Sequence, residues 1–322
     1  MLRRKISITI FVLGIICIGD LKAKSSAVTY DFSGGRFGDN LVSYCHAKWI
    51  SYRYNIPLLY KPFNYSDQLW MHYLEIHYTP ELEQQFSRVI VANKNTQIDP
   101  QSGDLYIIPF FPESIFNRND TDFPYLFTVE WQLPAFKGVL QQMISPICDV
   151  KTPEIPRDCL SVAVHVRRGT GWDIPNYRIT PEQLTASHPL RFAPDSFFIA
   201  QLKKIAALFG DSQIYVYLFT DHDNPLELLE KYKQAVRCDR MLFDCRTTLN
   251  NEFVNVLDDF FALLKFDCLI RADSNFSYIA SKLGNYALAI SPAHGLVIDG
   301  TTFIDEINFE MNHETCIVPE YQ

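Results

Sequence analysis

Residues 160–173 read LSVAVHVRRGTGWD, an apolar run that ends in two adjacent arginines and a glycine. Residues 160–166 are rich in β-branched side chains, a pattern typical of a buried strand. Arg167 and Arg168 therefore follow a strand at the edge of a sheet, which is where open α/β sheets bind their ligands. Arginine binds phosphate oxygens in a bidentate manner, so this stretch predicts a diphosphate site. The alternative is a strand that ends in two solvated arginines, with His165 as an ordinary core histidine.

The overall composition is that of a globular protein with room for two domains. The chain has 322 residues, of which 48% are hydrophobic and 20% are charged. This length can hold two domains of ordinary size. The formal net charge of -8 argues against a general nucleic-acid binder, because such proteins carry an excess of basic residues.

Residues 1–24 have the pattern of a targeting segment. Arg3, Arg4 and Lys5 precede an apolar run over residues 6–19. That run is long enough for the core of a signal peptide and short for a bilayer span of about 20 residues. We therefore expect a secretory signal or a short uncleaved anchor. The protein is expected in the secretory pathway, in the lumen of the endoplasmic reticulum or Golgi, or associated with a membrane.

The cysteines are compatible with export and give no sign of a metal site. Cys148 and Cys159 bracket a proline-rich segment, and Cys238 and Cys245 bracket residues 239–244, so either pair could close a small loop. The sequence contains no CxxC or Cys/His spacing of a zinc site, and we expect no bound metal.

Strands and helices alternate from the start of the first half. Residues 28–32 and 56–60 are predicted strands, with a glycine-rich turn at residues 33–38 and a helix over residues 39–54 between them. Backbone amides at the start of this helix can hold an anion or a sugar hydroxyl. The glycine spacing is not the full dinucleotide fingerprint, so a dehydrogenase is not favoured.

The second half repeats the alternation after a proline-containing linker at residues 151–157. Its predicted strands cover residues 160–166, 213–220, 268–271 and 287–290, and Ser291-Pro292 is expected to end the last of them. The pattern predicts an α/β protein with two facing Rossmann-like domains and a cleft between them. We place an acceptor-side domain at residues 27–150 and a donor domain at residues 151–322.

Two further polar sites follow predicted strands of the second half. Asp221 follows the strand at residues 213–220, where a carboxylate can hold ribose hydroxyls or a base edge. Residues 273–277 open a helix, and their hydroxyls and amides can seat a phosphate at the positive helix end. Simple helix capping is the alternative for both segments.

Taken together, the motifs resemble those of fucosyltransferases. Residues 34–41, GGRFGDNL, resemble the GGRLGNQL-type opening of the α1,2-fucosyltransferases. Residues 165–169, HVRRG, resemble the HxRRGD motif that α1,2-, α1,6- and protein O-fucosyltransferases share in full or in part. Residues 219–221 resemble their FSDD element, residues 274–280 their SNSTFSWWGAWL element, and residues 289–292 the strand that closes it. The motifs come in family order across most of the chain after residue 27.

This resemblance implies a GT-B fold and an inverting transfer of fucose from GDP-fucose to a hydroxyl of a glycan or glycoprotein, without a metal. It implies that Arg167 or Arg168 holds the diphosphate, with Arg167 favoured, and that Asp221 contacts the nucleoside. The candidate donor-binding residues are Gly35, Arg36, Asn40, His165, Arg167, Arg168, Asp221, Asp273, Ser274, Asn275, Phe276 and Ser277. The candidate catalytic residues are Arg167 and the possible bases Asp39, His46 and Asp173.

The sequence also departs from the family pattern. Thr170 stands where the family has an aspartate, Tyr278-Ile279 replaces a tryptophan pair, and Asp39 stands where the family often has asparagine. Two other functions therefore stay open. One is a protein that binds a nucleotide sugar or glycan without catalysis, and the other is an exported structural or interaction protein on a reused fold.

Overall fold

The computed structural model describes residues 25–93, 95–109, 128–169, 181–247, 255–311 and 314–319. The predicted leader at residues 1–24 and the candidate base Asp173 lie outside these ranges. Within them, no helix has both the length and the apolar composition that crossing a bilayer requires. The observed class is mixed α/β with parallel sheets, which confirms the class predicted from the sequence.

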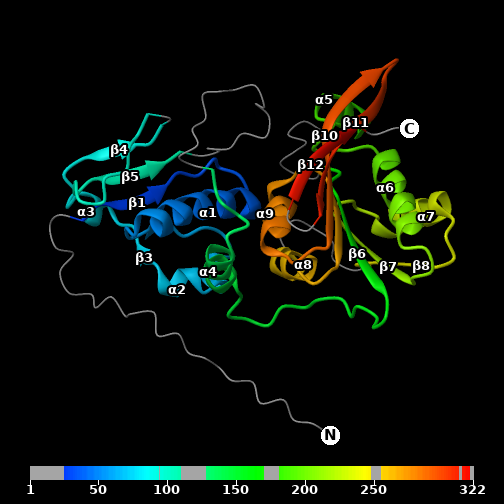
Figure 1. The fold of residues 1–322 in the computed structure, drawn as a ribbon, viewed down its shortest axis with the longest axis horizontal. Helices are drawn as coiled ribbons and strands as arrows, with labels where there is room; N and C mark the ends of the chain where they lie inside the picture. The colour runs from blue at the N-terminus through cyan, green and yellow to red at the C-terminus, as the bar shows by residue number, and fades with distance from the viewer. Residues whose placement is uncertain are drawn as a thin grey trace, which may run out of the picture.

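The first half is built on a small parallel sheet (Figure 1). Its strands are β1 (Ala27–Tyr30), β4 (Val89–Val91) and β5 (Leu105–Ile108), in the order β1-β5-β4, and β5 is parallel to both neighbours. The helix α1 (Phe37–Tyr54) follows β1 and packs against it. The other elements of this half are β2 (Leu59–Tyr60), η1 (Ser66–Gln68), α2 (Met71–Leu74), β3 (Ile76–His77), α3 (Pro80–Glu83) and α4 (Pro134–Ile144).

The second half is built on a seven-stranded sheet in the order β12-β11-β10-β9-β6-β7-β8. Neighbours from β10 through β8 are parallel, whereas β10, β11 and β12 pair antiparallel. The strands are β6 (Leu160–Val166), β7 (Ile214–Thr220), β8 (Met241–Cys245), β9 (Cys268–Arg271), β10 (Leu288–Ile298), β11 (Thr301–Met311) and β12 (Glu314–Pro319). The helices are α5 (Pro181–Ser187), α6 (Asp195–Leu208), α7 (Pro225–Val236), α8 (Val256–Leu263) and α9 (Asn275–Leu283).

The parallel part of this sheet has Rossmann-like connectivity. The chain starts at β6, adds β7 and β8 on one side, and then crosses to add β9 and β10 on the other side of β6. The strand order therefore reverses between β6 and β9. In open α/β sheets such a reversal leaves a crevice at the carboxyl ends of the two strands, and ligands bind there.

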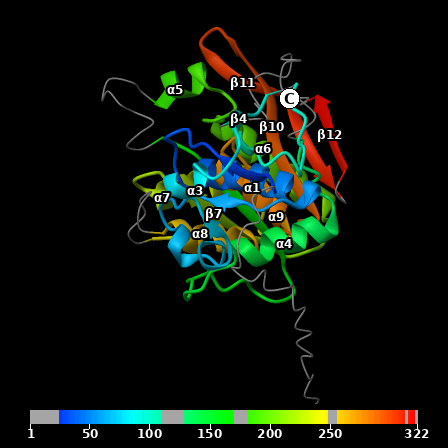
Figure 2. The same cartoon turned by 90° about the vertical axis from the view of Figure 1, so that its left-hand side faces the viewer.

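Helices cover both faces of the parallel strands, because the side chains of a strand alternate between two faces. Val162 and Val164 of β6 pack in an apolar cluster with α6 and α7, whereas Ala163 packs in a second cluster with α1, α8 and α9. Figure 2 looks from the side of the first half, so α1 lies toward the viewer and α8 and α9 lie behind it. The sheet is therefore buried on both sides, as its nearly continuous apolar strands require.

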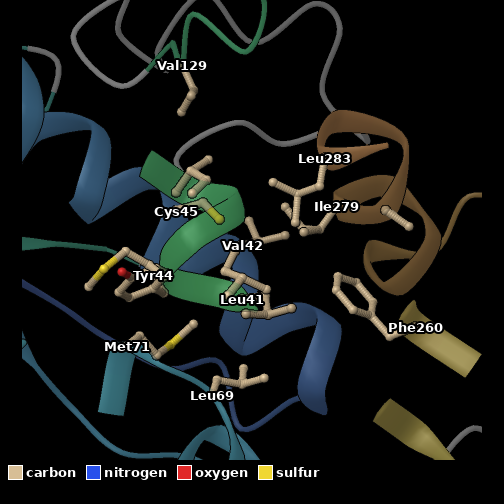
Figure 3. Close-up of a cluster of buried hydrophobic side chains, with 14 of the residues drawn as sticks. Leu41, Val42, Tyr44, Cys45, Leu69, Met71, Val129, Phe260, Ile279 and Leu283 are labelled. Carbon is tan, nitrogen blue, oxygen red and sulfur yellow. The ribbon is translucent and has the colours of Figure 1, made fainter. Parts of the chain in front are cut away.

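One apolar core continues from the first half into the second. Leu41, Val42 and Cys45 of α1 lie together with Ile279 and Leu283 of α9 (Figure 3). The linker predicted at residues 151–157 lies between α4 and β6 and forms neither helix nor strand. Because the core is continuous, the division into two domains with a cleft between them stays a prediction.

The first half also caps the carboxyl end of α9. Lys137 Nζ of α4 donates a hydrogen bond to Gly284 O at 2.6 Å, and Gln141 Nε2 donates to Leu283 O at 2.7 Å. Burial lowers the pKa of Lys137. Donors at this position satisfy carbonyl groups that the helix leaves without partners. The capping helps to fix α9 relative to the first half.

The prediction that Ser291-Pro292 ends the last strand of the fold is wrong. Instead, β10 continues to Ile298 and forms a long hairpin with β11. Register shifts between Pro292 and Gly295 mark a bulge, and a bulge is one of the few places where a proline is tolerated inside a sheet. The hairpin extends upward beside α5 in Figure 1. Strand β8, which the sequence patterns did not predict, covers Met241–Cys245.

Both suggested cysteine loops are corrected by the structure. Cys148, Cys159, Cys238 and Cys245 are free thiols, so neither pair closes a disulfide loop. The reason for the second pair is that Cys245 belongs to β8 and is buried in the sheet, opposite Leu218 of β7. Its sulfur is therefore part of the apolar core.

Candidate functional site

The candidate site lies at the strand-order reversal between β6 and β9. His165 is the Cα partner of Arg271 in β9, and Val166 is the partner of Thr220 in β7. The three strands therefore end at nearly the same level. The segments that follow them, which include Arg167 and Asp273, meet at one edge of the sheet.

The two adjacent arginines point to opposite faces of the sheet. Arg167 Nη1 lies 3.4 Å from Ser274 Oγ, on the face covered by α9. Arg168 Nη2 instead contacts Asp195 and donates to Tyr232 Oη at 3.1 Å, on the face covered by α6 and α7. The alternation of a strand explains this split, since neighbouring side chains start on opposite faces.

Arg168 belongs to an internal ion-pair network. Its Nη1 atom donates to Ala193 O at 3.1 Å, and its partner Asp195 also accepts from Lys231 Nζ at 2.6 Å and from Tyr232 Oη at 2.7 Å. Burial by itself raises the pKa of Asp195, but the positive charge of Arg168 and the bonds from Lys231 and Tyr232 leave it below its ordinary value. The Arg168 guanidinium is thus engaged by α6 and α7, and it anchors β6 to them.

Asp221 holds the turn that carries both arginines. Its carboxylate accepts hydrogen bonds from the backbone N–H of Arg168 at 2.6 Å and of Gly169 at 3.2 Å. Gly169 has φ of 76°, a conformation that favours glycine. Asp221 therefore shapes the backbone after β6; the nucleoside contact implied by the family resemblance stays a prediction.

His165 is a neutral imidazole at the centre of the site. Burial, with the nearby guanidinium groups of Arg167 and Arg271, lowers the pKa of His165 to about 3. Its ring centroid lies 5.8 Å from that of Phe276, and its Nδ1 atom is buried without a hydrogen-bond partner in the described part of the chain. A neutral ring can donate or accept one hydrogen bond here without adding charge.

The N-terminus of α9 faces Arg167. Ser274 occupies the N-cap position, and its hydroxyl accepts from Arg167. Asp273 is buried, and its backbone N–H donates to Leu190 O at 2.9 Å. Ser277 Oγ is fully buried and donates to backbone carbonyl groups, at 3.3 Å for Ser274 O. The Ser274 hydroxyl therefore lies beside Arg167, at the edge of the sheet.

The glycine-rich turn of the first half reaches the same helix end. Asn275 Nδ2 donates to Asp39 Oδ1 at 2.7 Å, and Asp39 Oδ2 accepts from the Arg36 N–H at 2.9 Å. A Cβ added to Gly35 would lie 2.4 Å from Asp39 Oδ2, so only glycine allows this approach. Asn40 is buried in the first turn of α1. Residues more than 230 positions apart thus share one site.

The candidate bases are not equally placed. Asp39 lies at the N-terminus of α1 beside Asn275, whereas His46 follows seven residues later, about 10 Å along the helix axis. His46 is buried, and its ring lies 6.1 Å from that of Trp131. Asp173 lies outside the described residues. The base assignment stays a prediction.

Arg271 lies at the site, although the sequence motifs did not predict it there. It ends β9 beside His165, and its side chain is 7% exposed. The signal was present in the sequence, because an arginine that follows three apolar residues of a buried strand is unusual. Among the described residues, no group of three or more His, Cys, Asp or Glu side chains is arranged to hold a metal ion.

No protein-family model matches the sequence, and no curated protein sequence matches it. Several solved structures are similar. One is the fucosyltransferase NodZ from Bradyrhizobium, with 13% identity, a TM-score of 0.46, and coverage of 87% of this chain and 98% of that one. A mutant of Arabidopsis thaliana FUT1 in complex with GDP has 12% identity, a TM-score of 0.47, and coverage of 83% and 70%. POFUT1 in complex with GDP-fucose has 10% identity, a TM-score of 0.42, and coverage of 82% and 96%.

Proposed function

We propose that the protein is a glycosyltransferase that transfers fucose from GDP-fucose, with inversion, to a hydroxyl group of a glycan or glycoprotein. The observation that carries the proposal is the contact between Arg167 Nη1 and Ser274 Oγ at 3.4 Å. It joins the arginine of the HVRRG motif to the N-cap of α9, at the strand-order reversal. The order of the fucosyltransferase-like motifs in the sequence supports the choice of fucose and of GDP.

The residues suit the chemistry of such a transfer. The acceptor oxygen attacks the anomeric carbon while the bond from that carbon to the diphosphate oxygen breaks, and the electron pair leaves with GDP. Arg167 and the backbone amides at the start of α9 can stabilise the charge that develops on the diphosphate. The acceptor proton passes to a base, for which Asp39, His46 and Asp173 are the candidates. The cationic groups let the proposed reaction proceed without a metal.

The proposal includes the setting of the reaction. The leader pattern at residues 1–24 supports entry into the secretory pathway or attachment to a membrane. A lumen of the endoplasmic reticulum or Golgi fits better than a periplasm, because an exported enzyme needs a compartment that is supplied with the nucleotide sugar. Residues 151–322 would hold the donor and residues 27–150 would face the acceptor.

A second candidate is a protein that binds a nucleotide sugar without transferring it. Asp39 favours this candidate, because both of its carboxylate oxygens accept hydrogen bonds, from Asn275 and from Arg36. A carboxylate held in this way is less available as a base. The two candidates share the donor site and differ only in turnover.

Two measurements test the proposal. Titration calorimetry with GDP and GDP-fucose should detect saturable binding to the parent protein, and GDP release from GDP-fucose should rise when a glycan acceptor is added. Binding without release on a broad acceptor panel would favour the second candidate. Absence of GDP and GDP-fucose binding in a folded sample would contradict both candidates.

A further inference from the structure

A second arginine lies beside the proposed diphosphate site. Arg271 is the last residue of β9, and its Cα partner across the parallel pair is His165 of β6. Leu269, two positions before Arg271, belongs to the apolar cluster of α1, α8 and α9, so Arg271 starts on the face that carries α9. Arg167 reaches the same face from the end of β6. Two guanidinium groups from adjacent strands therefore flank His165.

The charge of Arg271 is poorly compensated by its surroundings. Its side chain is 7% exposed, and its one hydrogen bond to the described residues runs from Nη1 to Ala272 O at 3.2 Å. Among the residues that the structure describes, the nearest carboxylate oxygen is Asp273 Oδ1, at 4.0 Å from Nη1. The Tyr278 ring centroid is 5.5 Å from Cζ. The other N–H groups of this guanidinium have no acceptor among the described residues.

Other buried cations of the chain are paired far better. Arg168, 15% exposed, contacts the carboxylate of Asp195 directly. Lys282, 10% exposed, lies over the same Tyr278 ring as Arg271 but is 2.9 Å from Glu310 Oε1. A buried charge without close compensation is costly, and buried charges in proteins are therefore usually paired. A bound anion would supply the missing pairing at Arg271.

We infer that Arg271 is a second phosphate-binding arginine, which contacts the diphosphate of the donor together with Arg167. The inference rests on the proposed function and adds to it a residue that no motif contains. A diphosphate bears two charged phosphoryl groups, and two guanidinium groups at the β6–β9 reversal can engage them from adjacent strands. Ser274, whose hydroxyl lies 3.4 Å from Arg167 Nη1, can offer that hydroxyl to the same ligand.

The alternative role for Arg271 is purely structural, as the counter-ion of Asp273. The two roles predict opposite effects on the ligand-free protein. If Arg271 serves Asp273, replacing it by methionine removes a positive charge beside a buried carboxylate and lowers the melting temperature. If it serves a bound diphosphate, Arg271→Met removes an uncompensated charge and leaves the melting temperature of the ligand-free protein unchanged or higher.

The experiment is titration calorimetry of the full chain with inorganic pyrophosphate, GDP and guanosine. Arg271→Met is compared with the parent, and Lys282→Met is the matched control that removes another buried cation from the same tyrosine. We expect Arg271→Met to weaken GDP and pyrophosphate binding roughly tenfold to a hundredfold, and guanosine binding little. Lys282→Met should bind all three ligands like the parent.

Arg271→Lys keeps the experiment decisive if the methionine variant does not fold. Lysine retains the charge and loses the planar fork, so GDP binding should weaken while folding is kept. Folded Arg271 variants that bind GDP like the parent would overturn the inference and leave the proposed function standing. Equal weakening for guanosine and GDP would also overturn it. Binding of pyrophosphate by the parent without any preference for GDP would instead remove the nucleotide from the proposed function.

Discussion

Asn275 donates a hydrogen bond from its side-chain Nδ2 to Asp39 Oδ1 at 2.7 Å, and this bond joins the N-termini of α9 and α1. The other carboxylate oxygen of Asp39 accepts from the backbone N–H of Arg36. One side chain thus caps α1 and links it to α9, the helix that borders the proposed donor site. Asp39 has a structural role here whether or not it is also a base.

Replacing Asp39 by alanine should destabilise the fold. The variant loses a helix cap and leaves Asn275 Nδ2 without its acceptor, so the free energy of unfolding should fall by about 1–2 kcal/mol. Urea denaturation measures the change. Glu130→Ala is the control, since its partner Arg53 and Glu130 itself are at least half exposed and such pairs contribute little. Equal stability of the Asp39 variant and the parent would refute the structural role.

Replacing glycine by alanine at position 38 should disturb the contact between α1 and α9. A Cβ at Gly38 would lie 2.4 Å from Phe276 N and 2.6 Å from Phe276 Cα, which is backbone that cannot yield easily. We expect Gly38→Ala to lower the free energy of unfolding by about 1–3 kcal/mol. Gly138→Ala, in the interior of α4 with open space around it, should instead raise stability by up to about 1 kcal/mol. Thermal or urea unfolding of both variants gives the comparison, and similar effects at the two positions would contradict it.

The two arginines of the motif should differ in function. Arg167→Lys keeps the charge but loses the fork beside Ser274, so GDP affinity should fall about tenfold to a hundredfold without a large change in melting temperature. Arg168→Lys disturbs the contacts with Asp195 and Tyr232, so it should lower the melting temperature while the folded fraction still binds GDP. Calorimetry with GDP and a thermal melt of each variant check both halves of the prediction. The reverse pattern would assign the diphosphate to Arg168.

Stability should depend on pH through His165. Its pKa in the folded protein is about 3, below the ordinary value of about 6.5, so between these two pH values only the unfolded state binds the proton. The stabilisation is therefore complete above about pH 6.5 and is lost as the pH falls toward 3, with a slope approaching about 1.4 kcal/mol per pH unit. Denaturant titrations from pH 7 to pH 4 measure this slope. His165→Gln should flatten the profile, whereas replacing the exposed His188 should not; an unchanged slope in the His165 variant would contradict the assignment.

Transfer is expected to be independent of divalent metals. The proposed donor site supplies positive charge through Arg167 and the N-terminus of α9, which is the role that a metal has on phosphate in other enzymes. GDP release should proceed at the same rate in the presence of EDTA and with added manganese. Loss of activity with EDTA and its recovery with manganese would show that a metal is needed.

The amino-acid sequence by itself determined the order of the elements around the site. Side chains alternate between the two faces of a strand, so the sequence predicts that those of Arg167 and Arg168 point to opposite faces of the sheet after β6. The structure confirms this. Local patterns suffice for this, because strand alternation and helix capping depend on residues close together in the chain. The sequence pattern predicts where β10 begins but not how far it continues. The bulge after Pro292, which lets the strand continue, depends on pairing with β11.

Only the tertiary structure decided which groups meet. Arg168 donates hydrogen bonds to Asp195 and Tyr232, which are 27 and 64 positions away in the sequence. Asp221 accepts hydrogen bonds from the backbone of the turn at Gly169. Arg271 reaches His165 because the strand order reverses between β6 and β9, and no local pattern encodes that crossing. The sequence therefore specifies which charges are present and where each strand ends. Which of those charges are compensated depends on contacts between distant segments, and these form only when the chain folds.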